Sequence, residues 1–148
     1  MVALAAAVAA PMASATEYQT MATGACKSAL PSFEGNIRSR PLAVQNEGGS
    51  VVFVSCAQQG NLDVKPTQLA INLVNNSKEV AVVNCTLVSG SLAPTYYVVS
   101  VTTIPGFDAQ GVVRPTAPQT SFASSNASWS CALPPGTGIS RIAQVRLL

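Results

Sequence analysis

Short runs of β-branched and aromatic residues, separated by turn residues, recur along most of the chain. The runs cover residues 51–56, 68–74, 80–88, 96–104, 127–133 and 139–147, with a weaker one at 36–44. Between them stand segments such as 46–49 (NEGG), 75–77 (NNS) and 134–136 (PPG). Such residues favour turns, because Gly and Asn tolerate positive φ and Pro fixes φ. Since no stretch has helical spacing of apolar residues over three turns, the pattern predicts an all-β fold. We expect an antiparallel β-sandwich of about seven strands, immunoglobulin-like or jelly-roll-like.

Alternation within the runs assigns the side chains that should form the core. In residues 127–133 (ASWSCAL), Trp129 and Cys131 fall on one face and serines on the other. The run 51–56 (VVFVSC) is dense enough to predict a strand covered on both faces. Tyr97, Val99 and Val101 share a face of the run 96–104. The predicted core therefore includes Phe53, Val83, Leu87, Val99 and Trp129.

The first fifteen residues have the pattern of a secretory signal peptide. Ten apolar residues (MVALAAAVAA) precede Pro11, and Ala13-Ser14-Ala15 is a small-x-small cleavage site. We expect cleavage after Ala15 and a single folded domain over residues 16–148. No Lys or Arg precedes the apolar stretch, so either the natural start lies upstream or Met1 is an internal codon.

Four widely spaced cysteines, Cys26, Cys56, Cys85 and Cys131, agree with export. An even number of cysteines behind a signal peptide predicts two disulfides. Four cysteines allow three connectivities, and we favour Cys26–Cys56 with Cys85–Cys131. The first bridge would tie the N-terminal segment to a strong strand, and the second would join two strands with similar surroundings. We therefore place the protein in the periplasm, at the cell surface or outside the cell.

Four stretches resemble a group of small exported bacterial proteins of unknown function. They are residues 35–38 (GNIR) leading to 51–56 (VVFVSC), 82–87 (VVNCTL), 128–135 (SWSCALPP) and 140–142 (SRI). The resemblance spans Cys26 to Leu148 and implies export and a disulfide-bonded β-domain, with no activity attached. This chain departs from the group at Ala57, where proline is common, and at Asn75 or Asn76, where an aspartate is common.

Composition excludes several classes of function. Eight Lys and Arg stand against six Asp and Glu, a net charge of +2, which lacks the basic excess of a nucleic-acid-binding protein. The absence of histidine removes histidine-dependent catalytic triads and imidazole metal sites. No apolar run reaches the length of a membrane-spanning helix, so we expect no integral membrane span.

Candidate chemistry is sparse. The carboxylates are scattered through turns, with neither the clustering of a calcium loop nor a recognisable catalytic pair. We therefore expect no metal, no cofactor and no enzymatic activity. Tyr96 and Tyr97 are adjacent in a strand and so point to opposite faces, which leaves one of them available as a binding residue.

Three functions remain open from the sequence. The first is a non-enzymatic exported protein that contacts an unidentified protein or envelope component. The second is a structural subunit of a surface fibre built by pilin-like strand addition. Charged residues make up only 9% of the chain, so copies would repel one another weakly and self-association stays open. The third is a carbohydrate-binding module.

Overall fold

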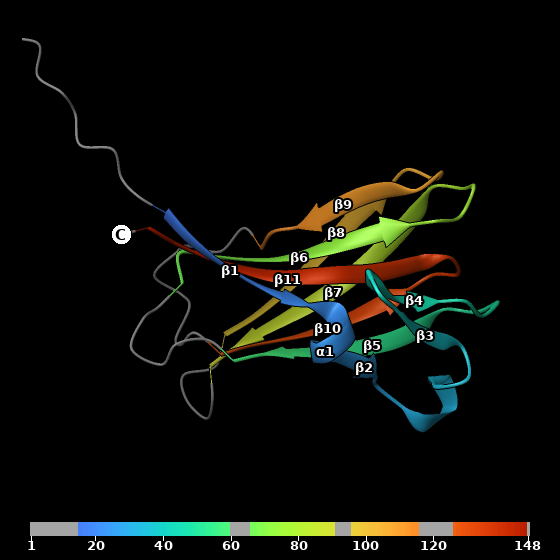
Figure 1. Cartoon of the computed structure of the whole chain (residues 1–148), viewed down its shortest axis with the longest axis horizontal. Coiled ribbons are helices and arrows are strands. Elements are labelled where there is room, and N and C mark those ends of the chain that lie inside the picture. Colours follow the sequence, from blue (N-terminus) through green and yellow to red (C-terminus); the bar gives the residue numbers. More distant parts are fainter. Residues whose placement is uncertain (1–14, 60–65, 91–95, 116–125, 148) are drawn as a thin grey trace, which may run out of the picture.

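The chain folds into two antiparallel β-sheets packed face to face (Figure 1). The computed structural model describes residues 15–59, 66–90, 96–115 and 126–147. The sheet we call sheet A has six strands, with the order β3-β4-β11-β6-β9 and β1 also paired to β11. Sheet B has five strands in the order β2-β5-β10-β7-β8. The predicted two-layer sandwich is confirmed.

The elements follow one another closely along the described chain. In order they are β1 (Ala15–Met21), α1 (Ala22–Ala25), β2 (Cys26–Ser28), a 3-10 turn (Pro31–Phe33), β3 (Ile37–Arg40), β4 (Ala43–Asn46), β5 (Val52–Gln58), β6 (Gln68–Asn75), β7 (Ala81–Ser89), β8 (Tyr96–Ile104), β9 (Ala109–Val113), β10 (Ala127–Leu133) and β11 (Thr137–Leu147). The seven predicted runs correspond to β5, β6, β7, β8, β10, β11 and the β3–β4 hairpin. Residues 1–14, most of the predicted signal peptide, lie outside the described residues.

Four strands were not anticipated as separate elements: β1, β2, β4 and β9. β1 is polar (ATEYQTM) and begins at the predicted cleavage site. β9 lies in a segment, 107–125, that the sequence predicts as a long loop or an irregular edge, because it is rich in proline and threonine and weakly patterned. Each strand forms because a long neighbour supplies its hydrogen bonds, β11 for β1 and β6 for β9. Pairing with a distant strand is a tertiary effect that local propensity does not report.

The core lies between the sheets and is built by side chains that alternate along each strand. Leu69, Ile71 and Leu73 of β6 face Trp129 and Leu133 of β10 across it, and all five are at most 1% exposed. Val83 and Leu87 of β7 are fully buried as well. The prediction of a core position is therefore confirmed for Val83, Leu87 and Trp129.

Phe53 and Val99 are not core residues, and both predictions are wrong. β5 is covered on one face only, with Val52, Val54 and Cys56 inward, so that Phe53 points outward and is 46% exposed. In β8 the register decides: Val99 pairs with Thr86 on the outer face of β7 and is 67% exposed. Residues directly opposite one another in an antiparallel ladder share a face, so β8 turns Val99 and Val101 outward.

Both disulfides have the expected connectivity and lie within sheet B. Cys26 of β2 is the register partner of Cys56 in β5, and Cys85 of β7 is the partner of Cys131 in β10. The Cα atoms are 4.0 Å and 4.1 Å apart, the short spacing of non-hydrogen-bonded cross-strand pairs. On the inner face of sheet B, the two bridges link β2 to β5 and β7 to β10, which are four of its five strands.

Four connections cross between the sheets at one end of the sandwich, on the right of Figure 1: β4–β5, β6–β7, β8–β9 and β10–β11. They are bound to one another by backbone hydrogen bonds. For example, the Asn76 N–H donates to the Gly136 carbonyl at 2.9 Å, and the Phe107 N–H donates to the Ser77 carbonyl at 2.7 Å. This end of the molecule also borders the site described next. Among the described residues, no helix is both long and apolar enough to traverse a lipid bilayer.

Candidate binding groove

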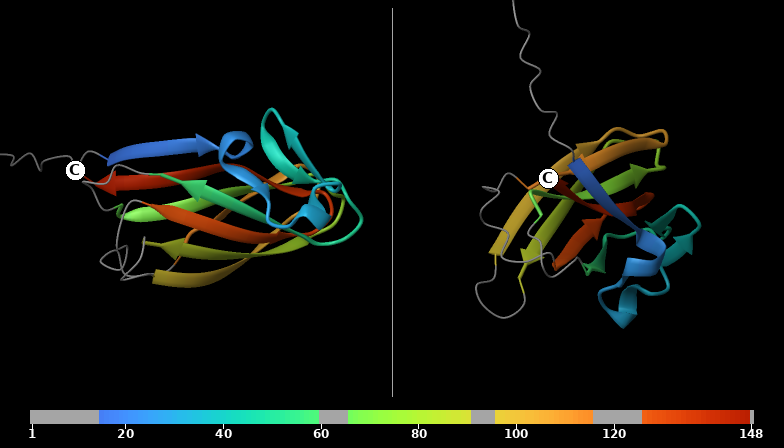
Figure 2. Two further views of the ribbon diagram at one scale, coloured as in Figure 1. Left: turned by 90° about the horizontal axis from the view of Figure 1, so that it is seen from below. Right: turned by 60° about the vertical axis from the view of Figure 1, so that its left-hand side comes forward.

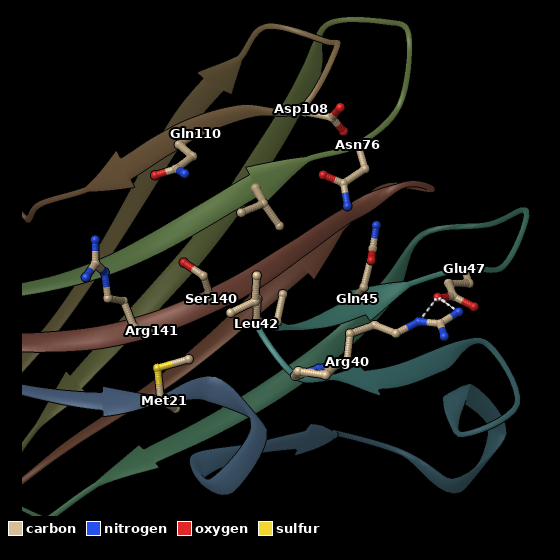
Figure 3. A pocket seen from close by; sticks show the side chains of 13 residues that line it. Met21, Arg40, Leu42, Gln45, Glu47, Asn76, Asp108, Gln110, Ser140 and Arg141 are labelled. Atoms are coloured by element: carbon tan, nitrogen blue, oxygen red, sulfur yellow. Dashed lines mark hydrogen bonds and ion pairs between the residues drawn. The ribbon is translucent and has the colours of Figure 1, made fainter.

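A groove of about 790 Å³ lies on the outer face of sheet A (Figure 3). Its floor is formed by β4, β11, β6 and β9, and the end of β1 and the β3–β4 hairpin form one rim. Figure 2 shows this hairpin standing beside the sheets, at the opposite edge from β9. The volume falls within the range of small-ligand sites.

The β3–β4 turn gives the groove an aliphatic wall. Pro41 and Leu42 lie at the turn, and Leu42 is 75% exposed although it is a large apolar residue. Met21 at the end of β1 lies next to them, and Val74 of β6 contributes to the floor. β4 approaches β11 closely because Gly138 has no side chain: a Cβ there would lie 2.8 Å from the Val44 carbonyl oxygen.

An irregularity in β11 brings two consecutive polar side chains to the groove. The register with β6 shifts between Ile139 and Arg141, so Ser140 is an extra residue in the ladder. Ile139 and Ile142 both stay fully buried in the core. Because two residues rather than one separate these inward side chains, Ser140 and Arg141 both line the groove.

The charges in the groove cancel. Arg40 and Glu47 form an ion pair, with Nε donating to Oε1 at 2.7 Å. Arg141 donates from Nη1 to the side-chain oxygen of Gln19 at 2.8 Å. Asp108 is the second carboxylate of the lining, so two guanidinium groups stand against two carboxylates. A groove without net charge offers no electrostatic preference for an anion or a cation.

Carboxamides supply most of the remaining polar lining. Asn76 and Gln110 are exposed, and their side chains have no hydrogen-bond partner within the described residues. Gln45 has one long contact, from Nε2 to the Gly136 carbonyl at 3.4 Å. Each carboxamide can both donate and accept. Figure 3 shows Gln45 and Asn76 pointing toward one another over the groove.

The β8–β9 turn places Asp108 at the edge of the groove. Phe107 and Asp108 both have positive φ, 64° and 61°, which is uncommon for residues other than Gly and rare for a bulky side chain. The turn is held against the β6–β7 connection, since a Cβ at Gly106 would lie 2.6 Å from the Lys78 carbonyl oxygen. Phe107 itself is 77% exposed, next to the groove residue Asp108.

The predicted binding residues lie elsewhere. Tyr97 is on the outer face of sheet B and is 67% exposed. The backbone of Tyr96 is part of β8, but its side chain lies outside the described part of the structure. Tyr97 is not among the residues that line the groove, and a binding role for Tyr96 and Tyr97 stays a prediction.

The groove residues were missed because they come from separate parts of the sequence. Asn76 and Asp108 read as ordinary turn residues. Gln110 falls in the segment 107–125, where no regular strand is predicted, and Gln45 directly follows the weak run 36–44. Only the strand order β4-β11-β6-β9 makes them neighbours. Within the described residues, no three His, Cys, Asp or Glu side chains are grouped to hold a metal ion.

Comparisons with known proteins place the chain in no family. No family model matches it, and no curated protein does. Among solved structures, it is similar to "Crystal structure of Podospora anserina GH26-CBM35 beta-(1,4)- mannanase" at 11% identity and TM-score 0.47, over 89% of this chain and 28% of the other. It is also similar to "CBM4 structure and function" at 9% identity and TM-score 0.41, over 89% and 86%. Thus the chain spans little more than a quarter of the mannanase. Both likenesses are distant.

Proposed function

We propose that this protein is a non-enzymatic, exported binding module that contacts an envelope or extracellular component through the groove of sheet A. The component is a neutral carbohydrate chain. One observation carries the proposal. A single open groove combines carboxamide side chains that have no internal hydrogen bond, equal numbers of positive and negative side chains, and an aliphatic wall.

The polar groups suit hydroxyl-rich ligands. A sugar hydroxyl donates one hydrogen bond and accepts others, and Asn76 and Gln110 offer both kinds of partner without first breaking an internal bond. The equal number of positive and negative side chains favours a neutral ligand over a phosphorylated or basic one. This is the feature that separates the groove from a nucleic-acid or acidic-peptide site.

The apolar wall suits the other face of a sugar. A pyranose ring presents C–H groups on its faces and hydroxyls around its rim. Aliphatic surface for the C–H groups comes from Pro41, Leu42 and Met21. The carboxamides, which lie across the floor, are placed to bind the hydroxyls. Among the described residues that line the groove none is aromatic, so the proposed binding does not depend on ring stacking.

A protein segment is a poorer occupant of this groove. An extended peptide binds a sheet mainly by pairing its backbone with a free strand edge. The floor strands β11 and β6 are paired on both sides, so their backbone groups are already used. Contact with a protein partner therefore belongs to another surface of the molecule.

The test is a screen of neutral oligosaccharides against the oxidised chain, followed by calorimetric titration of variants. Asn76→Ala and Gln110→Ala should each weaken binding several-fold while the thermal unfolding midpoint stays unchanged. Asn84→Ala is the matched control, because Asn84 is an exposed asparagine on β7 of sheet B, far from the groove lining. The absence of any oligosaccharide ligand, or an equal effect of Asn84→Ala, would contradict the proposal.

A further inference from the structure

The edge strand β8 differs from the other edge strands of the sandwich. Exposed edges are templates for pairing with another chain, and natural proteins protect them with charges, prolines or short length. β2 has three residues including Lys27, β3 carries Arg38 and Arg40, and β1, which pairs with β11 alone, carries Glu17. β9 has five residues and runs into Arg114 and a proline. β8 has nine residues, and its sequence, YYVVSVTTI, contains neither a charge nor a proline.

The outer face beside this edge is apolar. Tyr97, Val99 and Val101 of β8 are 67%, 67% and 62% exposed, and Val82 of β7 is 50% exposed. β8 pairs with β7 on one side only. Along its other side, a hollow of about 400 Å³ separates residues 99–102 from residues 112–114 at the β9 edge. The described structure therefore leaves room beside β8.

The free side of β8 presents the backbone groups of its outward-facing residues. Cys85 and Cys131 have the Cα spacing of a non-hydrogen-bonded pair, 4.1 Å. In an antiparallel sheet, a residue that forms a non-hydrogen-bonded pair with one neighbouring strand forms a hydrogen-bonded pair with the other. Cys85 and its β8 partner Ser100 are therefore a hydrogen-bonded pair. The N–H and C=O groups of Val99 and Val101 consequently point away from β7, toward the hollow.

We propose that β8 pairs with β8 of a second copy of this chain, in antiparallel fashion about a two-fold axis at Ser100. This register uses the whole strand, because it pairs Val99 with Val101 and Tyr97 with Thr103 of the other copy. The paired residues both point outward, and both present their backbone groups at the edge. The strand is thus complementary to itself in side chains, hydrogen-bonding groups and charge.

The dimer is closed and weak. A two-fold contact uses the same edge on both copies, so it does not propagate into a fibre. One strand pair buries little surface, which places the contact among weak, transient interfaces. The nearest cation to the edge is Arg114, present once per copy, so added salt should strengthen association rather than weaken it. Because pairing uses sheet B, both grooves on sheet A stay open.

Sedimentation velocity across a concentration series tests the proposal. The oxidised chain should show a reversible monomer–dimer equilibrium, and Val99→Lys should weaken it by at least about tenfold by placing a charge at the edge. Val80→Lys is the matched control, since Val80 is 65% exposed but precedes β7 and lies off the edge. A chain that stays monomeric at hundreds of micromolar overturns the proposal and leaves the edge to a segment of another protein. Equal weakening by both variants also overturns it.

The register has its own test. Ser100 faces Ser100 across the axis as a non-hydrogen-bonded pair, the geometry in which this protein already forms its two disulfides. Ser100→Cys should therefore give a covalent dimer on mild oxidation, whereas Ser128→Cys, on the outer face of β10, should not. Crosslinking of both variants at the same rate would overturn the proposed pairing. Both experiments measure association of the chain without any carbohydrate present. Their outcome is therefore independent of the carbohydrate-binding proposal.

Discussion

Asn46 and Asn75 share three matching hydrogen bonds at two corners of the sandwich. Each side-chain nitrogen donates to the backbone carbonyl four residues further on, Ser50 and Glu79, at 2.8 Å in both cases. Each side-chain oxygen accepts from the backbone N–H two residues further on, at 2.9 Å and 3.0 Å. Both asparagines are fully buried. The β4–β5 and β6–β7 connections are therefore two copies of one sheet-crossing turn.

Each asparagine also binds the turn to a neighbouring strand. The amide of Asn46 donates to the Leu133 carbonyl at the end of β10, at 2.8 Å. The amide of Asn75 donates to the Ile104 carbonyl at the end of β8, at 3.2 Å. Both strands then cross back to sheet A through a proline and a glycine. The two side chains thus fasten all four crossings that border the groove.

This likeness implies that Asn75→Asp and Asn46→Asp destabilise the protein strongly. A carboxylate keeps the shape of the carboxamide but cannot donate to the carbonyl oxygens around it, and it is buried as a charge. We expect a loss of about 3 kcal/mol or more in the free energy of unfolding, measured by urea denaturation. Asn76→Asp is the control, because Asn76 is exposed and its side chain makes no internal bond. A midpoint for Asn75→Asp equal to that of Asn76→Asp would refute this reading.

Gly136 lies between the two turns and should not accept a side chain. Its N–H donates to the Asn46 carbonyl and its carbonyl accepts from the Asn76 N–H, both at 2.9 Å. Its φ is +77°, and a Cβ there would lie 2.9 Å from the Ser77 Cβ. We expect Gly136→Ala to cost about 1–2 kcal/mol of stability.

Gly49→Ala is the matched change for that experiment, since a Cβ at Gly49 meets nothing within 4 Å. It should leave the thermal midpoint unchanged or slightly raised. Equal midpoints for the two alanine variants would show that Gly136 is not needed for its backbone conformation.

The disulfides should contribute similar amounts of stability. They join residues 30 and 46 positions apart, and the chain-entropy model gives about 4 kcal/mol for each. The Cys85→Ala/Cys131→Ala and Cys26→Ala/Cys56→Ala variants should each lose roughly this amount in guanidinium titrations. Reductant should lower the midpoint of the native chain and of both variants. A native chain whose midpoint is indifferent to reductant would contradict the assigned role of the bridges.

The strand pattern was predictable because turn residues and alternation are local signals. Residues 127–133 show this best, since Trp129 and Cys131 face inward as their alternation indicates. The repeat containing Asn46 and Asn75 was not evident. Both asparagines precede a valine-rich strand and stand ten residues before a disulfide cysteine, Cys56 or Cys85, but the turn sequences themselves differ. The similarity lies in the hydrogen bonds of the two asparagine side chains, which the sequences of the turns do not reveal.

The candidate sites were not predictable for a different reason. The groove needs the strand order, and the extra residue Ser140 appears in the sequence only as a break in alternation between Ile139 and Ile142, which does not show where the polar side chains point. The β8 edge needs the register, because both faces of YYVVSVTTI carry valine and threonine. Facing β7, the strand turns Ser100 and Thr102 partly inward and Val99 and Val101 outward. An apolar set on the outside of a sheet is a departure from alternation that only pairing reveals.

Because of this outward-facing apolar set, two apolar strand residues that look alike in the sequence differ in burial. Leu87 is fully buried against Trp129, whereas Val99 on the neighbouring strand is mostly exposed. Leu87→Ala should therefore cost about 2–5 kcal/mol, from lost burial and the cavity left behind. Val99→Ala should change stability by about 0.5 kcal/mol or less. Urea denaturation at a protein concentration low enough to keep the chain monomeric makes the comparison. A large loss for Val99→Ala under those conditions would mean that Val99 packs against the core and would contradict the register of β8 with β7.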